Sequence, residues 1–374
     1  MSNSNRNFGL DLIRALAICL VVFSHATYLV FPNAENLFVT GARTLGAVGV
    51  DIFFVLSGFL IGGILLKQID QNQTRFKDLF TFWKRRWYRT LPNYFLILLI
   101  NLILLITLGK VVPQSWYLYL PFLQNFYQPH PDFFTEAWSL SIEEYAYLFL
   151  PFILFSGFYF TKEKSSQKKW FIGASILAIL FGLILKSIYV QDVDVLNYKY
   201  WSSTYRKVVV YRMDSIYVGF VLIYFVNEYS NFVTKFKKPM FVIGTFLFFW
   251  MHAFVFKWEI LPETNTAFYV FIYLQSVSLS IALVFPLIIN LPKPTAFLEK
   301  TIYFLSTRSY SIYLINYSIV LLNIEEIVKR YHASHFGKAI AVSSFLILTL
   351  LLSNILYSYY EKPILVFRDK RLKM

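Results

Sequence analysis

Residues 46–66 read GAVGVDIFFVLSGFLIGGILL, and this stretch decides the fold class of the chain. Its only charged residue is Asp51. A helix rises about 1.5 Å per residue, so about 20 apolar residues cross the ~30 Å hydrocarbon core of a bilayer. The stretch therefore predicts a transmembrane helix. Similar runs recur along the whole chain, and together they predict an all-α polytopic transmembrane helical bundle.

The composition supports a lipid environment. Of the 374 residues, 57% are hydrophobic, 20% are aromatic and only 15% are charged. A water-soluble core cannot hide that much apolar surface. The aromatic content and the lack of heptad or Gly-x-y periods exclude disorder, coiled coil and collagen. The single cysteine, Cys19, excludes a disulfide framework and a cysteine-based zinc site.

We expect about ten helical spans, each long enough to cross a membrane. The fifth and sixth are interrupted by Lys186, Arg212 and Asp214, so nine or eleven spans stay open. The expected spans are 8–29, 46–66, 91–109, 140–159, 170–189, 208–226, 239–256, 267–290, 302–322 and 339–360.

The basic residues indicate the orientation of these spans. With a cytoplasmic amino terminus, 22 lysines and arginines fall in inside segments and 9 in outside loops. The positive-inside rule then places both termini in the cytoplasm. The net charge of +14 is interpreted as topology rather than as a nucleic-acid surface. The loops are short, so we expect residues 1–374 to form a single membrane domain without an extra soluble domain.

Charged residues inside the apolar runs are candidates for a functional site, because each costs about 2.5–3.5 kcal/mol on insertion scales. Arg14 and His25 are eleven positions apart, which places them on one helical face and ~16 Å apart along the axis. Asp11 could pair with Arg14 as a purely structural ion pair, and His25 could be a packing residue. The full set is Asp11, Arg14, His25, Asp51, Glu143, Glu144, Arg212 and Asp214.

Two further segments allow either a purely structural or a functional interpretation. Small residues in the Gly46–Ile61 segment allow either close helix packing or room for a ligand. In the segment Trp83–Pro92, Arg86 and Arg89 share a helical face and could grip an anion in a forked way. A plain positive-inside cluster would look similar.

Glu143 and Glu144 follow Trp138-Ser-Leu-Ser141-Ile near the outer start of the fourth span. Neighbouring acids point ~100° apart on a helix, so only one of them can face a given partner. In the expected topology one carboxylate starts at the level of His25. A carboxylate that orients an imidazole is what general-base catalysis needs, because it fixes the tautomer and raises the basicity.

These segments, in this order, resemble the acyltransferase-3 family of integral membrane O-acyltransferases, from Phe8 to about Pro363. Each is weak by itself, and seven in order are specific. They are Arg14-x10-His25, Gly49-Val-Asp-Ile-Phe-Phe-x2-Ser57-Gly58, Arg86-x2-Arg89, Trp138-Ser-Leu-x2-Glu143-Glu144, Tyr211-Arg212-Met-Asp214-Ser-Ile-x2-Gly219, Ser309-Tyr-Ser-Ile-Tyr-Leu314 and Glu361-Lys-Pro363.

The resemblance implies that His25 is the catalytic histidine and that Glu143 supports the reaction centre. It also implies that Arg14, Arg86 and Arg89 bind the acyl donor, with CoA held at the cytoplasmic face and the acceptor modified outside. Family members often carry His where this chain has Asn316. Asn cannot relay a proton at neutral pH, so an acid/base role at that position is in question. Many members also carry a fused esterase-like domain, which this chain does not show.

We therefore expect an enzyme that transfers an acyl group, with acetyl preferred, from acetyl-CoA or another acyl-CoA to a carbohydrate hydroxyl. Its partners would be a surface glycan or lipid-linked sugar and the lipid bilayer, with no nucleic acid. The expected location is the bacterial cytoplasmic (inner) membrane, in multi-pass form. We expect Asp51, Ser57, Arg212 and Asp214 to shape the acceptor site. No metal is expected, because His332 and His335 lack a third ligand.

Other interpretations remain. Ten spans with buried charges also suit a secondary transporter of a small anionic or sugar-like solute, but internal repeats and broken helix pairs are not evident. A scaffold protein would leave the shared face of Arg14 and His25 unexplained. Within the enzyme hypothesis, His25 could act as a base or accept the acyl group itself.

Overall fold

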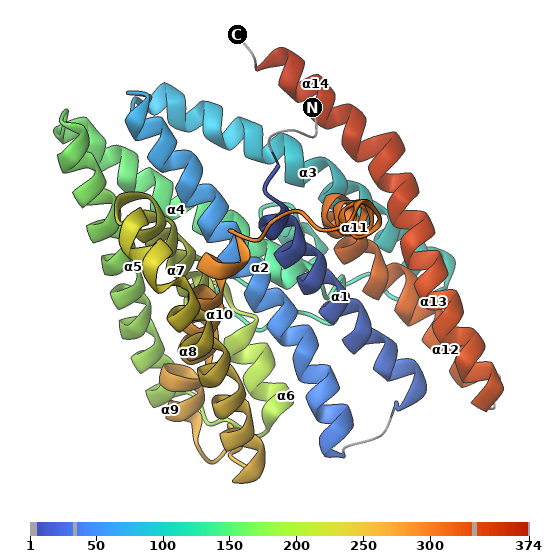
Figure 1. Ribbon diagram of the computed structural model, residues 1–374. Coiled ribbons are helices and arrows are strands. Elements are labelled where there is room, and N and C mark those ends of the chain that lie inside the picture. The colour runs from blue at the N-terminus through green and yellow to red at the C-terminus, as the bar shows by residue number, and fades with distance from the viewer. Residues whose placement is uncertain (1–5, 33–35, 331–334, 373–374) are drawn as a thin grey trace.

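The computed structural model describes residues 6–32, 36–330 and 335–372, and all regular elements in these ranges are helical. Figure 1 shows long helices packed side by side. The long helices are α1 (Phe8–Val30), α2 (Leu37–Asp70), α3 (Phe76–Thr107), α4 (Ala137–Phe160), α5 (Lys164–Asp192), α7 (Val209–Glu228), α8 (Ser230–Lys257), α10 (Leu274–Ile288), α11 (Ala296–Ile315) and α13 (His335–Leu356).

Short elements join or extend these helices. Four of them are π-helical turns, a form that often occurs at functional sites. The short elements are η2 (Trp116–Tyr119), α6 (Tyr198–Trp201), η3 (Ser202–Arg206), α9 (Thr266–Phe268), η4 (Tyr269–Tyr273), η5 (Asn316–Leu321), α12 (Leu322–Arg330), η6 (Tyr357–Glu361) and α14 (Lys362–Arg371).

The expected spans all coincide with helices. Nine helices in the described ranges are long and apolar enough to cross a membrane. The expected span 140–159 falls in α4, which is 24 residues long but is not one of those nine. Its first half carries Ser139, Ser141, Glu143 and Glu144, which lower its apolar content. The all-α polytopic fold predicted from the sequence is thus confirmed, and the chain is a multi-pass membrane protein.

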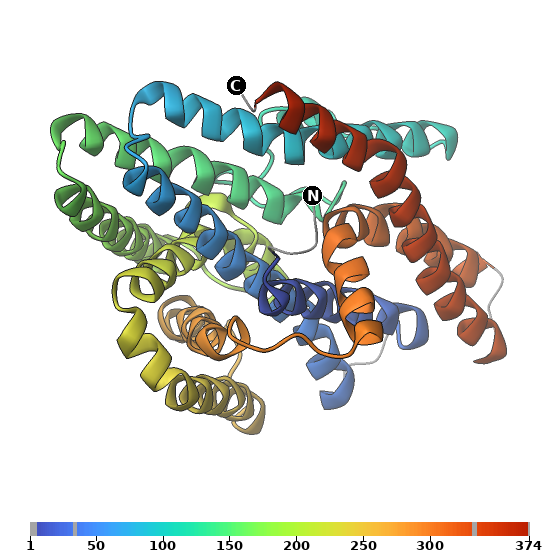
Figure 2. The ribbon, with the colours of Figure 1, turned by 45° about the horizontal axis from the view of Figure 1, so that its top comes forward.

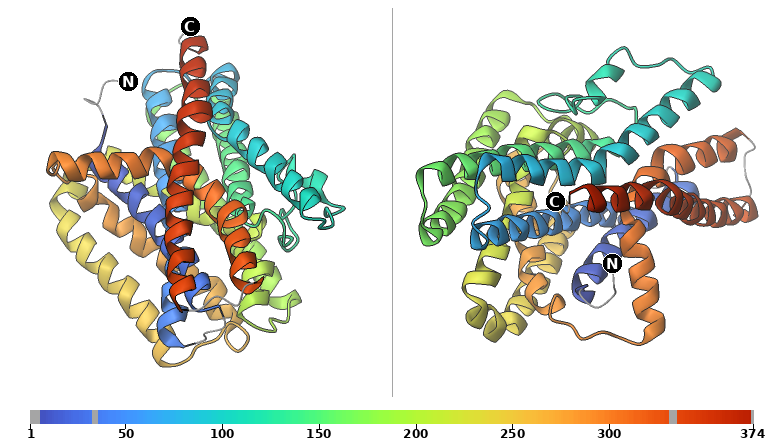
Figure 3. Two further views of the ribbon diagram at one scale, coloured as in Figure 1. Left: turned by 90° about the vertical axis from the view of Figure 1, so that its right-hand side faces the viewer. Right: turned by 90° about the horizontal axis from the view of Figure 1, so that it is seen from above.

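The two described ends of the chain lie at the same end of the molecule, as Figure 1 and the left view of Figure 3 show. We call this the terminal end. The helix α1 runs away from it and α2 returns to it (Figure 1). An even number of crossings brings the termini to one side, in agreement with about ten spans. That the terminal end faces the cytoplasm stays a prediction.

The helix α2 forms the centre of the bundle. It packs against α1 on one side and α7 on the other, and α5 packs behind α7; Figure 2 shows the two groups of helices that flank it. A Cβ atom added at Gly58 would lie 1.8 Å from the carbonyl oxygen of Ile216 in α7. At Gly49 the nearest atom is the carbonyl oxygen of Ala17 in α1, at 2.6 Å. The small residues of this stretch therefore serve close helix packing.

The outer surface of the bundle is apolar. Phe246, Trp250 and Ile347 expose more than half of their surface, as do many other large hydrophobic side chains. In a soluble protein such a surface would aggregate, whereas in a bilayer it faces lipid. The charged residues of the apolar runs point inward instead, and several of them are fully buried.

Candidate active site

His25 lies near the end of α1 and is bonded to Asn316, the first residue of η5. Its Nδ1 atom is 2.5 Å from Oδ1 of Asn316. The amide nitrogen of Asn316 donates to the carbonyl oxygens of Ile312 at 2.8 Å and Tyr313 at 2.9 Å. A flipped amide would set its oxygen against those two carbonyls, so Oδ1 must face the imidazole. The position that we questioned as a proton relay therefore contacts the histidine directly.

This bond fixes the tautomer of His25. An amide oxygen only accepts hydrogen bonds, so Nδ1 of the imidazole must carry the proton. The other ring nitrogen, Nε2, then keeps its lone pair and is the basic atom. Asn316 is fully buried, and the ring of Tyr317 lies 4.9 Å from the imidazole ring, centroid to centroid. The side chain of His25 is thus held from two directions.

Glu136 is a site residue that the sequence interpretation missed. It precedes α4 directly, and its Oε1 accepts hydrogen bonds from the Ser318 hydroxyl at 2.5 Å and the Ser318 amide at 3.3 Å. Its other carboxylate oxygen is buried without a partner. Burial raises the pKa of Glu136 to about 7. The available signal was an acid two positions before Trp138, but the sequence interpretation considered only Glu143 and Glu144.

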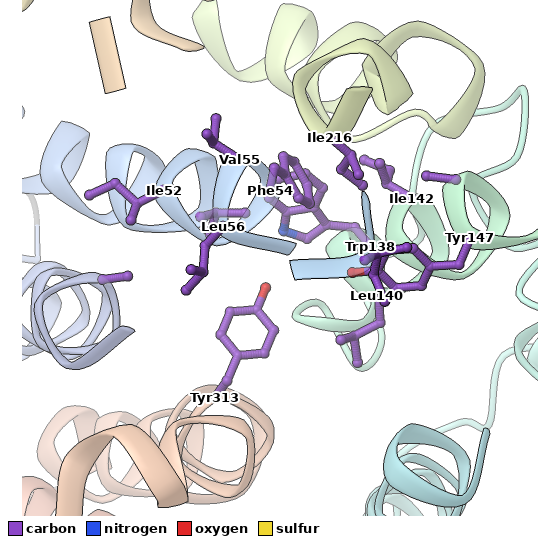
Figure 4. Close-up of a cluster of buried hydrophobic side chains, with 14 of the residues drawn as sticks. Ile52, Phe54, Val55, Leu56, Trp138, Leu140, Ile142, Tyr147, Ile216 and Tyr313 are labelled. Atoms are coloured by element: carbon purple, nitrogen blue, oxygen red, sulfur yellow. The ribbon is translucent and has the colours of Figure 1, made fainter. Parts of the chain in front are cut away.

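Tyr313 connects the start of α4 to η5. Its hydroxyl is 2.7 Å from the Ser139 hydroxyl and donates to the backbone oxygen of Glu136 at 3.2 Å. Figure 4 shows Tyr313 pointing from α11 toward Trp138 and the first turns of α4, beneath α2. The start of α4, η5 and His25 therefore form one connected region.

Glu143 does not occupy the place that we expected. It accepts hydrogen bonds from Ser57 at 3.1 Å and Tyr147 at 3.0 Å, and it forms an ion pair with Arg86 at 3.2 Å. The expected contact with His25 is replaced by that of Asn316. The reason is that residues 137–142 are already buried, so α4 begins inside the protein and carries Glu143 toward the terminal end.

Arg14, Arg86 and Arg89 come together although they lie on two helices. Arg14 donates to Ser306 of α11 at 3.2 Å, and Tyr310 of α11 donates to the backbone oxygen of Thr90, the neighbour of Arg89 in α3, at 2.8 Å. Arg86 stacks on the ring of Tyr147 at 4.3 Å, and its Nε atom is buried without a hydrogen-bond partner. Among the ion pairs in the described ranges, none includes Arg89. The three donor-site arginines predicted from the sequence thus share one region.

Asp11 has several partners in this region. It pairs with Arg6 at 2.5 Å, lies 3.5 Å from Arg14, and accepts a hydrogen bond from Ser306 at 2.5 Å. Ser306 also accepts a hydrogen bond from Arg14 at 3.2 Å. The ion pair between Asp11 and Arg14 that we considered therefore exists, but Arg6 holds Asp11 more closely. The guanidinium of Arg14 is only partly neutralised by it.

The remaining predicted residues form buried ion pairs in the helix core. Asp51 of α2 pairs with Arg212 of α7, and Asp214 of α7 pairs with Lys186 of α5. Gln275 also donates to Asp214 at 2.9 Å. Arg212 and Lys186 are fully buried. We expected Arg212 and Asp214 to shape an outer acceptor site; in the structure their ion pairs connect α7 to α2 and α5.

No group of three potential metal-ligating side chains occurs in the part of the chain that the structure describes. Of the two histidines considered as ligands, His332 lies outside the described residues, and His335 opens α13.

The fold and the site define a class of protein: a multi-pass membrane protein with an oriented imidazole toward one end and clustered arginines toward the other. The profile of the acyltransferase-3 family, described as "Acyltransferase domain", matches residues 7–358. The chain belongs to this family, and the resemblance seen in its sequence is confirmed.

Curated relatives point in the same direction. The chain is 30% identical over 213 residues to the peptidoglycan O-acetyltransferase OatA of Listeria monocytogenes, a match that covers 52% of the chain and 31% of OatA. It is 29% identical over 203 residues to YrhL of Bacillus subtilis, whose name proposes that same activity; the match covers 50% of the chain and 28% of YrhL.

The chain is also 29% identical over 194 residues to SACOL0978, a candidate O-acetyltransferase of Staphylococcus aureus, with 48% of the chain and 30% of that protein covered. The chain thus spans under a third of the length of these relatives. No solved structure matches it.

Proposed function

We propose that this protein is an O-acyltransferase of a bacterial cytoplasmic membrane that moves an acetyl group from cytoplasmic acetyl-CoA to a hydroxyl of a cell-surface carbohydrate. One observation carries the proposal: the bond between His25 and Asn316 leaves Nε2 as the basic atom. The family and the names of the relatives support acetyl transfer to a surface glycan. The choice of acetyl-CoA as donor, and of opposite membrane faces for donor and acceptor, is supported by the arrangement of charged residues.

In the proposed reaction, the acceptor hydroxyl oxygen attacks the thioester carbonyl carbon. Nε2 of His25 takes the hydroxyl proton as the new carbon–oxygen bond forms. The carbon–sulfur bond then breaks, and the leaving CoA thiolate receives the proton from the imidazolium. The bond from Nδ1 to Asn316 persists throughout and stabilises the ring in one orientation. The side chain of Asn316 therefore orients the base but does not carry the proton.

The arginine cluster suits the phosphates of the donor. Arg guanidinium groups bind phosphate in a bidentate, planar manner. Arg89 and the unpartnered Nε of Arg86 offer such donors, and Arg14 lies beside them. In this proposal Glu143 positions Arg86 through their ion pair, and thereby supports the reaction from the donor side.

The distance along α1 supports transfer across the membrane. Arg14 and His25 are eleven residues apart, or ~16 Å along the helix axis. An extended pantetheine arm covers a distance of this order. The nucleotide could then stay at the terminal end while the thioester reaches His25. The acyl group crosses and CoA does not.

The acceptor-binding role expected of Asp51, Ser57, Arg212 and Asp214 stays a prediction. The ion pairs of Asp51 and Asp214, and the bond from Ser57 to Glu143, favour a structural role instead. If the role is structural, the Asp51→Asn variant will lose thermal stability without a selective change in acceptor KM.

The experiment uses purified protein in sealed vesicles of known orientation. Acetyl-CoA supplied only at the cytoplasmic face should acetylate a saccharide supplied only at the opposite face, as read by mass spectrometry. The His25→Ala variant should lose this transfer while it keeps its thermal unfolding midpoint. Transfer only with both substrates on the cytoplasmic side would refute the sidedness. Activity of His25→Ala within tenfold of the parent would refute the catalytic role.

A further inference from the structure

Three cations lie close together between the start of α6 and the start of α7. Lys199 lies in α6, Arg206 ends η3, and Lys207 follows it. In the proposed orientation this segment is outside, where lysine and arginine are usually few. It holds three of the nine basic residues assigned to outside loops. Their presence there is not explained by topology.

The structure fixes Lys207 and Arg206 against the start of α4. The backbone oxygen of Lys207 accepts a hydrogen bond from the Asn125 side chain at 2.6 Å, and the same side chain donates to the Trp138 backbone oxygen at 3.0 Å. Arg206 lies over the Trp138 ring at 5.0 Å and donates to the Ser202 hydroxyl at 3.2 Å. The two cations are therefore held by buried polar groups rather than by a loose loop.

Among the residues that the structure describes, no carboxylate lies within ion-pairing distance of these cations. The ion pairs found within the described ranges include none of Lys199, Arg206 and Lys207. The charged groups around Lys207 are the exposed carboxylate of Asp132 and two further cations, Arg206 and Lys199. The local charge is positive.

These cations belong to the region that holds the base. Asn125 ties Lys207 to Trp138 at the start of α4, and Glu136, which precedes α4, bonds Ser318 of η5, whose first residue is the partner of His25. A nearby cation opposes the imidazolium that forms when His25 takes a proton. An anion bound at Lys207 would remove this opposition at the moment of reaction. The arrangement thus makes sense if the acceptor itself carries a negative group.

We propose that Lys207 and Arg206 bind an anionic group, a carboxylate or a phosphate, of the glycan that receives the acyl group. This inference rests on the proposed function and names the chemical class of its acceptor. The donor phosphates would not reach this position, because Arg14 of the arginine cluster lies ~16 Å from His25 along the axis of α1. The bound anion places a neighbouring sugar hydroxyl at Nε2 of His25.

The test compares matched acceptors in nanodiscs of uncharged lipid with acetyl-CoA as donor. The probes are a uronic-acid oligosaccharide, its neutral methyl ester and the same oligosaccharide carrying a phosphate. Lys207→Gln should raise the KM for the charged acceptors at least tenfold and leave the KM for the ester and for acetyl-CoA within twofold. The Lys207→Arg variant keeps the positive charge, so its KM values for the charged acceptors should equal those of the parent protein.

Lys257→Gln serves as the control, because Lys257 lies at the end of α8 beside the Trp258 ring, at 4.8 Å. It should leave all KM values unchanged. An equal change for the ester and the charged acceptors in Lys207→Gln would overturn the inference. The inference would also be overturned if Lys207→Gln changed the KM for the charged acceptors only when anionic lipid is added, because the cations would then bind a lipid headgroup.

Direct binding separates this inference from the proposed activity. The parent protein should bind the uronic-acid oligosaccharide more tightly than the ester in calorimetry, and Lys207→Gln should lose at least tenfold of that preference. This result without any acetyl transfer would refute the proposed function and keep the anion site. Acetyl transfer without a preference for the charged saccharide would refute the anion site and keep the function.

Discussion

The change Asn316→Leu tests the central claim, that a buried amide holds His25 in the basic tautomer. Leucine has the same number of side-chain heavy atoms as asparagine and the same branching at Cγ, so the substitution leaves little cavity. It removes the acceptor 2.5 Å from Nδ1. The imidazole must then keep an unsatisfied buried N–H or move its proton to Nε2. Either change lowers the population of the reactive form.

The size of the effect follows from the cost of the lost acceptor. A buried donor left without a partner costs about 1–3 kcal/mol. Each 1.36 kcal/mol changes a rate tenfold, so kcat for acetyl transfer should fall about 5- to 150-fold. The KM for acetyl-CoA should stay unchanged, because the arginine cluster lies elsewhere. The assay is initial-rate transfer by purified protein at saturating acceptor and donor.

Asn323→Leu provides a matched control. The Asn323 amide also donates to backbone oxygens one turn earlier, those of Ile319 at 2.7 Å and Ser318 at 3.5 Å. Its partners include no histidine. A kcat for Asn316→Leu within twofold of the parent would refute the tautomer argument. An equal loss in both variants would show that the backbone bonds, and not the contact with His25, carry the effect.

Three further predictions concern the donor site, the packing of α2 against α7, and the cation Lys207. Arg86→Lys should raise the KM for acetyl-CoA, since lysine lacks the planar fork of arginine. Arg85→Lys should leave this KM unchanged, because Arg85 donates to the Leu372 carbonyl instead. Equal effects of the two substitutions would mean that these arginines only set the orientation of the protein in the membrane. Gly58→Ala should lower the thermal unfolding midpoint by an amount equivalent to about 1–3 kcal/mol, because the added Cβ would collide with the backbone oxygen of Ile216. At Gly41 an added Cβ meets nothing within 4 Å, so Gly41→Ala should unfold like the parent. Burial lowers the pKa of Lys207 to about 8, with Arg206, Asp132 and Lys199 as the charged groups around it. Affinity for a charged saccharide should therefore fall as the pH rises from 7 to 9, and the same fall in Lys207→Arg, which stays charged, would contradict this origin.

The fold could be predicted from the sequence because hydropathy is a local property. Each apolar run of about 20 residues forms its helix irrespective of its neighbours, since a bilayer offers the backbone no other hydrogen-bond partners. For the same reason the shared face of Arg14 and His25 was available from their spacing. The position of these helical runs along the chain needed no tertiary information.

The partners of those residues were decided by the tertiary structure. Helical periodicity says which side chains share a face, but it does not say which helix lies opposite or at what depth. His25 meets Asn316, 291 positions away, and Asp51 meets Arg212, 161 positions away.

The depth of α4 had the largest consequence. Hydropathy places the span 140–159, but the buried turn before it moves Glu143 to Arg86 and brings Glu136 to η5. A window of apolar residues can slide along the membrane normal at little cost. Only packing against the neighbouring helices fixes its level, and that level decides which carboxylate belongs to which end of the site.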